Sequence, residues 1–184
     1  MARRVTRAEA VAAVVALPRD RTVWVGLDGF GGAGKTTLAA ELAAAVPGAV
    51  VVHVDDFARP SLAEWDWDRF AAQLTGPLLA DRPAQYQVWD WDRDAGGDWV
   101  DVLPGRLVVV EGVSSTRVQV DVPWDLTIWV EAPREVRLHR ALERDGPDMI
   151  RRWLDDWMPS EEAYAARERP QERVDLIVDG TVCI

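Results

Sequence analysis

The chain has 184 residues, a length that suits one domain with a sizeable hydrophobic core. Its hydrophobic fraction of 48% argues against extensive disorder, and its net charge of −10, with no long cluster of basic residues, argues against nucleic-acid binding. No apolar stretch is long enough to span a bilayer, and the single cysteine, Cys183, cannot form an intramolecular disulfide, so we expect a cytoplasmic protein that does not bind membranes.

Residues 1–20 predict an amphipathic helix rather than a secretory signal, because Glu9 interrupts the apolar run and no small-residue cleavage site follows. Short apolar runs rich in β-branched residues then predict five buried strands, at 22–27, 49–54, 106–112, 126–132 and 174–180. Helical patterns lie between them, at about 36–46, 65–80, 134–145 and 148–168. Buried strands that alternate with helices predict a three-layer α/β/α fold with a mainly parallel five-stranded sheet, as one domain over residues 1–184.

Residues 82–102 have neither a sustained helical nor a sustained strand period. They contain Trp89, Trp91 and Trp99. We interpret this segment as a partly ordered aromatic insertion.

A glycine-rich segment separates the first predicted strand from the helix at 36–46. Its sequence, GFGGAGKT at residues 29–36, matches the phosphate-binding pattern G-x-x-x-x-G-K-[ST]. Glycines let backbone N–H groups converge on phosphate oxygens, and the N-terminus of the following helix adds positive potential. The pattern predicts a P-loop NTPase that binds a nucleotide triphosphate through Gly29, Phe30, Gly31, Gly32, Ala33, Gly34, Lys35, Thr36 and Thr37.

Lys35 is the only lysine in the chain, and the other basic residues, out of 21 in total, are all arginine. This bias indicates that position 35 requires a compact ammonium group, because the wide guanidinium of arginine does not suit so tight a loop. We expect Lys35 to bridge the β- and γ-phosphates of ATP, and the Thr36 hydroxyl to bind Mg²⁺.

Two classes of nucleotide-binding protein are disfavoured. A guanine-specific switch protein needs an N-K-x-D motif, which cannot exist in a chain whose only lysine is Lys35. A mechanical ATPase usually has an Asp-Glu pair at the end of a strand, whereas here Glu111 has no aspartate before it.

Carboxylates lie at the ends of two predicted strands. Asp55 and Asp56 follow the strand at 49–54, and Glu111 ends the apolar run of the strand at 106–112. Ligands bind at the carboxyl ends of the strands in an open parallel sheet. We therefore expect Asp55 to accept a proton from an attacking hydroxyl and to help bind Mg²⁺, and Glu111 to bind the metal directly or through water.

The segments LDGFGGAGKTT, VHVDDF, VVVEGV, IWVEAPREVRLHRALERD and DLIVDG, in this order, resemble the uridine kinase–phosphoribulokinase group of P-loop kinases. The similarity extends from about residue 22 to 180. It implies that Asp55 is the catalytic base and that Lys35, Thr36 and Glu111 serve phosphate and metal. It also implies a helical lid, at about 137–155, that closes over the phosphates.

Three arginines of the predicted lid, Arg137, Arg140 and Arg144, have the spacing i, i+3, i+7 and so share one helix face. We expect Arg140 and Arg144 to be catalytic, because an arginine on this face can neutralise charge that develops during phosphoryl transfer. Arg137 is instead expected to be solvated and paired with Glu143 or Asp145.

The acceptor pocket of the family is formed by the segment after the second strand and by an aromatic insertion, here EWDWDRF (64–70) and YQVWDWDRD (86–94). This resemblance gives four candidate substrate residues, Asp56, Asp66, Trp89 and Asp90. For each tryptophan of the two segments, including the two within Trp89–Asp92, the alternative is packing in the core. His53 is expected to pack within its strand and His139 to be exposed on a helix, so no transition-metal site is expected.

The leading hypothesis is an ATP- and Mg²⁺-dependent kinase that transfers the γ-phosphoryl group to a hydroxyl of a small molecule, a nucleoside as in uridine kinases. A vitamin precursor or a sugar is the alternative acceptor, because Trp89-Asp90-Trp91 stands where nucleoside kinases have Tyr-Asp-Phe. A non-catalytic ATP-binding module and a partner-stimulated ATPase are further alternatives. The sequence leaves homo-oligomerisation open.

Overall fold

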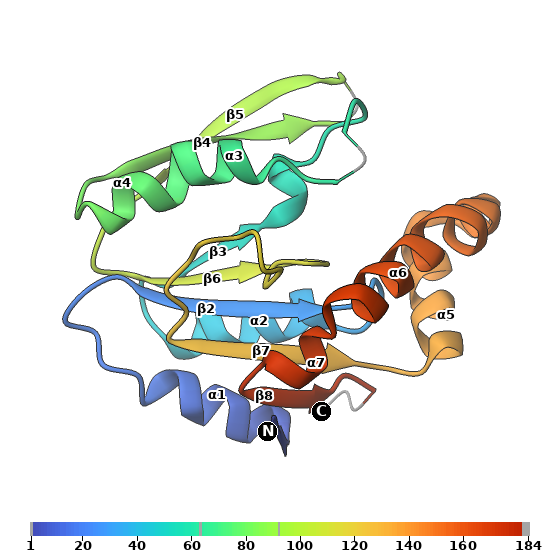
Figure 1. The fold of residues 1–184 in the computed structure, drawn as a ribbon, viewed down its shortest axis with the longest axis horizontal. Coiled ribbons are helices and arrows are strands. Elements are labelled where there is room, and N and C mark those ends of the chain that lie inside the picture. The colour runs from blue at the N-terminus through green and yellow to red at the C-terminus, as the bar shows by residue number, and fades with distance from the viewer. Residues whose placement is uncertain (1, 63, 92, 182–184) are drawn as a thin grey trace.

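The structure is a computed structural model that describes residues 2–62, 64–91 and 93–181. Cys183 and Asp92 lie outside the described residues. Helices and strands carry the labels of Figure 1.

A parallel sheet forms the centre of the molecule (Figure 1). Its strand order is β1-β8-β7-β2-β6-β3, and every pairing is parallel. The strands are β1 (Arg3–Val5), β2 (Val23–Gly29), β3 (Val50–His53), β6 (Leu107–Glu111), β7 (Leu126–Glu131) and β8 (Leu176–Asp179). The five predicted strands are confirmed, but the sheet has a sixth strand, β1, which the sequence did not reveal.

The first helix is shorter than predicted because β1 precedes it. Residues 3–5 pair with β8, and helix α1 (Arg7–Val15) begins only after Thr6. Thr6 and Glu9 form a capping box, in which each side chain accepts a hydrogen bond from the other residue's backbone N–H. This cap fixes the point where the extended chain becomes helical.

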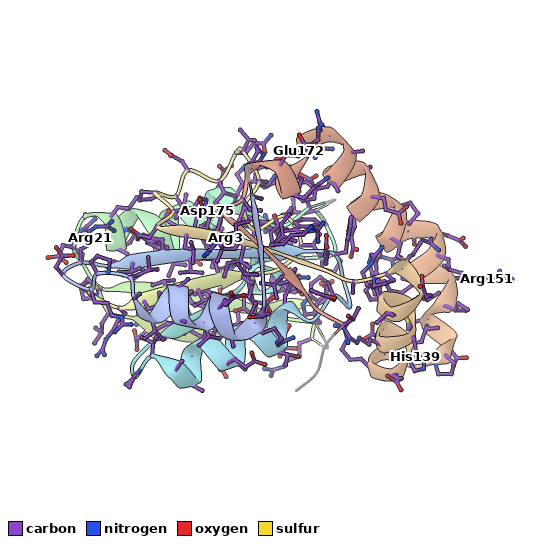
Figure 2. All side chains as sticks on the ribbon, turned by 90° about the horizontal axis from the view of Figure 1, so that it is seen from below. Arg3, Arg21, His139, Arg151, Glu172 and Asp175 are labelled. Carbon is purple, nitrogen blue, oxygen red and sulfur yellow. The ribbon has the colours of Figure 1, made fainter. Side chains whose placement is uncertain are left out.

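Two layers of helices and loops cover the sheet, so the α/β/α architecture is confirmed. Helices α1 and α2 (Lys35–Ala45) pack on one face, where Leu38 and Leu42 meet Val25 and Val109. On the opposite face, Trp24 and Val108 meet α3 (Trp67–Phe70), a π-helical turn (Ala71–Thr75) and α4 (Gly76–Leu79). Figure 2, viewed from below, shows α1 and α2 on the side of the sheet opposite α6 (Met158–Glu168) and α7 (Pro170–Arg173).

The segment 82–102, interpreted from the sequence as a partly ordered insertion, forms an antiparallel hairpin, so it is more regular than its pattern indicates. Strand β4 (Ala84–Asp90) pairs with β5 (Ala95–Val102) in a second, two-stranded sheet. In β4 the side chains alternate, with Ala84 and Tyr86 in the core and Gln85 exposed. Strand β5 is exposed along most of its length, and its sequence therefore shows no such alternation.

The remaining helices broadly follow the predicted pattern. The helix expected at 65–80 begins at Trp67, because Asp66 caps it. Helix α5 (Arg134–Asp145) agrees with its predicted bounds, and a 3₁₀ turn (Pro147–Met149) and a π-helical turn (Arg152–Trp157) lead into α6. Over the described ranges, none of the helices combines the length and apolar character that crossing a membrane requires.

Phe57 joins the hairpin to the main body. Its buried ring packs against Phe70 and Tyr86, with ring centroids 5.2 and 5.1 Å away.

Phe57→Ala should therefore lower the free energy of unfolding by about 3–5 kcal/mol, since removal of a buried ring leaves a cavity. Urea denaturation measures this loss. Trp99→Ala, on the exposed strand β5, is the control and should cost less than about 0.5 kcal/mol; equal losses in the two variants would contradict the assigned packing.

Candidate active site

The loop 29–36, hereafter the P-loop, connects the carboxyl end of β2 to the N-terminus of α2, as the sequence predicts. Gly32 has a φ of +73°, and a Cβ there would lie 2.4 Å from the carbonyl oxygen of Arg137. Only glycine suits this position, both for its backbone angle and for the close approach of α5. The buried ammonium of Lys35 folds back over the loop and donates a hydrogen bond of 2.9 Å to the Phe30 carbonyl.

Thr36, Glu111 and His53 form a hydrogen-bonded cluster beside the P-loop. Glu111 ends β6, and its Oε1 accepts a hydrogen bond of 3.1 Å from the Thr36 hydroxyl. The same oxygen lies 2.5 Å from His53 Nδ1, at the end of the neighbouring strand β3. The His53 side chain is 43% exposed. The prediction that His53 packs within its strand is therefore wrong; its hydrogen bond across the strand ends could not be deduced from sequence spacing.

The charges in this cluster influence one another. The hydrogen bond to Glu111 raises the pKa of His53 above its usual value, and the negative charges of Glu111, Asp56 and Asp55 act in the same direction. Burial acts to raise the pKa of Glu111, but the hydrogen bond with His53 and the positive charge of Lys35 bring it below the usual value. Glu111 is thus held as a carboxylate.

Asp55 and Asp56 lie on a 3₁₀ turn (Val54–Phe57) that follows β3 directly. Asp55 is exposed at the surface, but the protein around it removes part of its hydration and raises its pKa, while the positive charge of Lys35 opposes this rise. Asp56 also has a raised pKa because of desolvation, and its Oδ2 accepts a hydrogen bond of 3.3 Å from the Tyr86 hydroxyl. The two adjacent carboxylates therefore have different partners: Asp55 interacts with the P-loop lysine, and Asp56 with the hairpin.

The three α5 arginines that share the predicted face, Arg137, Arg140 and Arg144, have three different environments. Arg137 is only 4% exposed, with its guanidinium 4.3 Å from the centre of the Phe30 ring, so the prediction that it is solvated is wrong. Arg140 Nη1 donates to the carbonyls of Gly180, at 2.9 Å, and Gly32, at 3.4 Å.

Arg144 is 65% exposed and donates to Asp145 at 2.6 Å. The hydrogen bond to Asp145 raises the pKa of Arg144, and the charges of Asp55 and Glu111 add to the effect. Arg144 is therefore within electrostatic reach of the carboxylates of the site. His139 is exposed on the same helix, as predicted, and Figure 2 shows it there with Arg151 on the outer part of the helical region.

Asp28 is a site residue whose role the sequence did not reveal. Its carboxylate is fully buried and accepts hydrogen bonds of 2.7–3.1 Å from Gly29 N, Ser114 N, Thr116 N, Thr116 Oγ1 and Tyr164 Oη. These donors come from the start of the P-loop, from the loop after β6 and from α6. One carboxylate therefore fixes three segments to one another.

Helix α6 makes a second polar contact with the P-loop through Glu161. The Oε2 atom of this buried carboxylate accepts a hydrogen bond of 2.9 Å from the backbone N–H of Gly31. Glu161 and Tyr164 are three residues apart, so they lie on the same helix face. The sequence around both residues shows only a helical pattern, which cannot reveal contacts with residues some 130 positions away in the chain.

The structure places only some of the candidate substrate-binding residues near the P-loop. Asp66 caps α3 by accepting from Arg69 N at 2.9 Å and pairs with Arg59, and Asp90 accepts from Arg93 N at 3.0 Å. Among the described residues, no hydrogen bond or ion pair connects Asp66 or Asp90 to the P-loop. Trp89 Nε1 is buried, with no hydrogen-bond acceptor in the described part of the chain.

Comparison with known proteins shows where this arrangement belongs. Residues 25–169 match the family model described as an AAA domain. The chain belongs to the AAA domain family. It is 24% identical over 139 residues to the uridine kinases of Borrelia turicatae (strain 91E135) and Borrelia hermsii (strain HS1 / DAH). Each match covers 66% of this chain and 66% of the relative, so the chain spans just under two thirds of the length of these relatives.

Solved structures show the same fold. A protein described as a possible uridine kinase from Bacillus stearothermophilus matches this AAA domain with a TM-score of 0.71, at 19% identity over 94% of this chain and 97% of that one. A candidate fructose transport system kinase from Silicibacter sp. TM1040 matches with a TM-score of 0.61, at 25% identity over 95% and 98% of the two chains. The P-loop fold and the resemblance to uridine kinases are confirmed.

The role of Asp28 in this AAA domain can be tested by two substitutions of graded severity. Tyr164→Phe removes one donor and should lower the free energy of unfolding by about 1–2 kcal/mol. Asp28→Asn puts an NH₂ group where an oxygen now accepts N–H groups, and should cost more than about 3 kcal/mol. Thermal and urea unfolding measure both values, and an Asp28→Asn variant as stable as the parent chain would contradict the proposed role.

The hydrogen bond between His53 and Glu111 predicts a titration that NMR can follow. Because the pKa of His53 is raised, its imidazole should lose its proton only above the usual value of about 6.5. The stabilising contribution of this pair is full below pH of about 6.5 and is lost as the pH rises through the folded-state pKa. Glu111→Gln should lower the titration midpoint of His53. The resonance of His139, which pairs with Glu143, serves as internal control; an unchanged His53 midpoint would disprove the coupling.

Proposed function

We propose that this protein is an ATP- and Mg²⁺-dependent kinase that transfers the γ-phosphoryl group to a hydroxyl of a small molecule. The observation that carries this proposal is the charge coupling between the P-loop and two strand ends. Lys35 interacts electrostatically with both Asp55 and Glu111, and the Thr36 hydroxyl donates to Glu111. Groups that suit a phosphate, a metal ion and an acceptor hydroxyl are therefore adjacent at one edge of the sheet.

The P-loop has the features that triphosphate binding requires. Glycines such as Gly32 keep its inner surface free of side chains, and the N-terminus of α2 directs its unpaired N–H groups toward the loop. Lys35 is buried beside these groups, and a bound phosphate offers its ammonium stronger acceptors than the Phe30 carbonyl. Lys35 would then stabilise the negative charge on the transferring group.

The residues beside the P-loop also suit Mg²⁺. The Thr36 hydroxyl and the Glu111 carboxylate are hard oxygen ligands, and they lie 3.1 Å apart. Mg²⁺ usually takes one or two protein oxygens and completes its coordination with substrate phosphates and water. When bound, the ion would neutralise charge that develops on the phosphate oxygens. Thr36 and Glu111 are its proposed ligands, with Asp55 as a further one.

Asp55 is the proposed general base. Its pKa is raised toward neutral pH compared with that of an ordinary aspartate, so its carboxylate is a better proton acceptor. In this role Asp55 would orient the acceptor hydroxyl and take its proton as the oxygen attacks phosphorus. Arg144, whose charge acts on Asp55, is the proposed lid residue that would approach the transferring group, whereas Arg140 supports the P-loop through Gly32 and Gly180.

The acceptor is proposed to be a nucleoside, in line with the relatives described as uridine kinases. The candidate fructose transport system kinase among the similar structures keeps a sugar as the alternative. Asp56, beside Asp55 and hydrogen-bonded to Tyr86, is the carboxylate best placed to contact this molecule. Trp89 is the proposed aromatic contact, because its buried N–H is free to donate within the described part of the chain.

The experiment that tests this function is phosphoryl transfer from ATP, with Mg²⁺, to a panel of nucleosides, sugars and vitamin precursors, read by mass spectrometry. We expect a phosphorylated nucleoside. Asp55→Asn should retain ATP binding but lower kcat by about 10²–10⁴-fold, the usual contribution of a general base. Asp98→Asn, which changes an exposed carboxylate on β5, is the control and should behave as the parent chain.

Unchanged turnover in the Asp55→Asn variant would rule out Asp55 as the base. Binding of ATP without transfer to any member of the panel would argue against the kinase assignment and for an ATP-binding module. Hydrolysis that only a partner protein stimulates would favour an ATPase.

A further inference from the structure

A cavity of about 560 Å³ lies at the turn between β1 and α1. Its walls are Arg4, Val5, Thr6, Arg7, Ala8, Glu9 and Asp179. Val5 ends β1 and pairs with Val178 of β8, so the cavity lies at the carboxyl ends of these two strands. In a parallel sheet this is the edge where the P-loop lies.

Two residues of the cavity wall lead directly to the P-loop. Arg7 is only 5% exposed and binds Glu41 of α2 through its Nε and Nη2 atoms. Its remaining terminal nitrogen, Nη1, lies 3.8 Å from the position that a Cβ on Gly34 would occupy. Asp179 precedes Gly180, which is in backbone contact with Ala33, because a Cβ on Gly180 would overlap the Ala33 carbonyl oxygen.

We infer that this cavity receives the nucleoside part of the triphosphate donor, so that the β1–α1 turn completes a nucleotide site whose phosphate part is the P-loop. The inference rests on the proposed function. It assigns a ligand-binding role to a segment that precedes the P-loop by some 20 residues and carries no nucleotide-binding motif.

The groups on the other sides of the P-loop already have partners or proposed roles. Asp55 and Glu111 lie on the β3–β6 side, where their carboxylates suit a metal ion and an acceptor hydroxyl. On the side of α5 and α6, Arg137 covers Phe30 and Glu161 binds the N–H of Gly31. The β8–α1 side has the cavity described above, and its volume is within the range of about 300–1,000 Å³ typical of ligand pockets.

The composition of the walls also suits a nucleoside. Val5 and Ala8 offer apolar surface for a flat ring, and charged groups of both signs, among them Arg7 and Asp179, can pair with the acceptors and donors of a base and a ribose. A smaller cavity of about 260 Å³, lined by Thr127 and Asp175 among others, lies where β7 and β8 begin, at the opposite edge of the sheet.

A single substitution separates nucleoside binding from phosphate binding. Ala8→Trp places a large ring at the cavity wall, on an exposed position of α1 that tolerates size. Ala12→Trp, one helical turn along the same exposed face and outside the cavity, is the matched control. Isothermal titration calorimetry with Mg²⁺ present measures the affinity of each protein for ATP and for inorganic tripolyphosphate, which has the phosphates but no nucleoside.

We expect Ala8→Trp to weaken ATP binding at least tenfold and to leave tripolyphosphate binding within twofold of the parent chain, while Ala12→Trp changes neither. Equal ATP affinity in all three proteins would overturn the inference and leave the proposed function intact. Equal weakening of ATP and tripolyphosphate in the Ala8→Trp variant would also overturn it, because the effect would then act on the P-loop. If the parent chain binds neither ligand, the proposed function fails, and the inference fails with it.

Discussion

The buried carboxylate of Asp28 is the interaction on which the arrangement of the site depends. A fully buried charge is tolerated only when hydrogen-bond donors surround it, and Asp28 takes its donors from three separate segments. The first peptide of the P-loop, the loop after Glu111 and helix α6 must therefore fold together. If any one of these segments is displaced, the Asp28 carboxylate loses hydrogen-bond donors and its buried charge is less well compensated. The phosphate cradle is consequently a product of tertiary structure as much as of its own glycines, which by themselves are conformationally permissive.

A second constraint is the excess of negative charge around one lysine. The positive charge of Lys35 acts on Asp55, Glu111 and Glu161, and each of these carboxylates is at least partly desolvated. Its narrow ammonium group lies inside the loop, where it also reaches the Phe30 carbonyl. A guanidinium needs a wider and planar space for its several donors. This accounts physically for a lysine that survives at position 35 in a chain that otherwise uses arginine.

The sequence predicted what local pattern and spacing determine. The five buried strands followed from apolar runs, and the P-loop followed from its octet between a strand and a helix. Strand β1 was missed because three residues form a strand only by pairing with the edge of β8. Glu161 and Tyr164 were missed because their partners, Gly31 and Asp28, are distant in sequence. The burial of Arg137 depends on the ring of Phe30, which helix periodicity cannot reveal.

The same contacts divide the proposed lid into two parts. At the base of α5, Arg137 stacks on Phe30, and Arg140 donates to carbonyls of the P-loop and of the turn after β8. These bonds make the base of the helix a part of the phosphate cradle, because any movement there would displace the loop itself. Arg144, one turn beyond Arg140, contacts only its neighbour Asp145 and the face of Trp153 in the described structure, and it is largely exposed. In the proposed function, lid closure would exchange the Asp145 carboxylate for a phosphate at Arg144 while the base of α5 stays in place. Preorganisation and movement would then be properties of different turns of one helix.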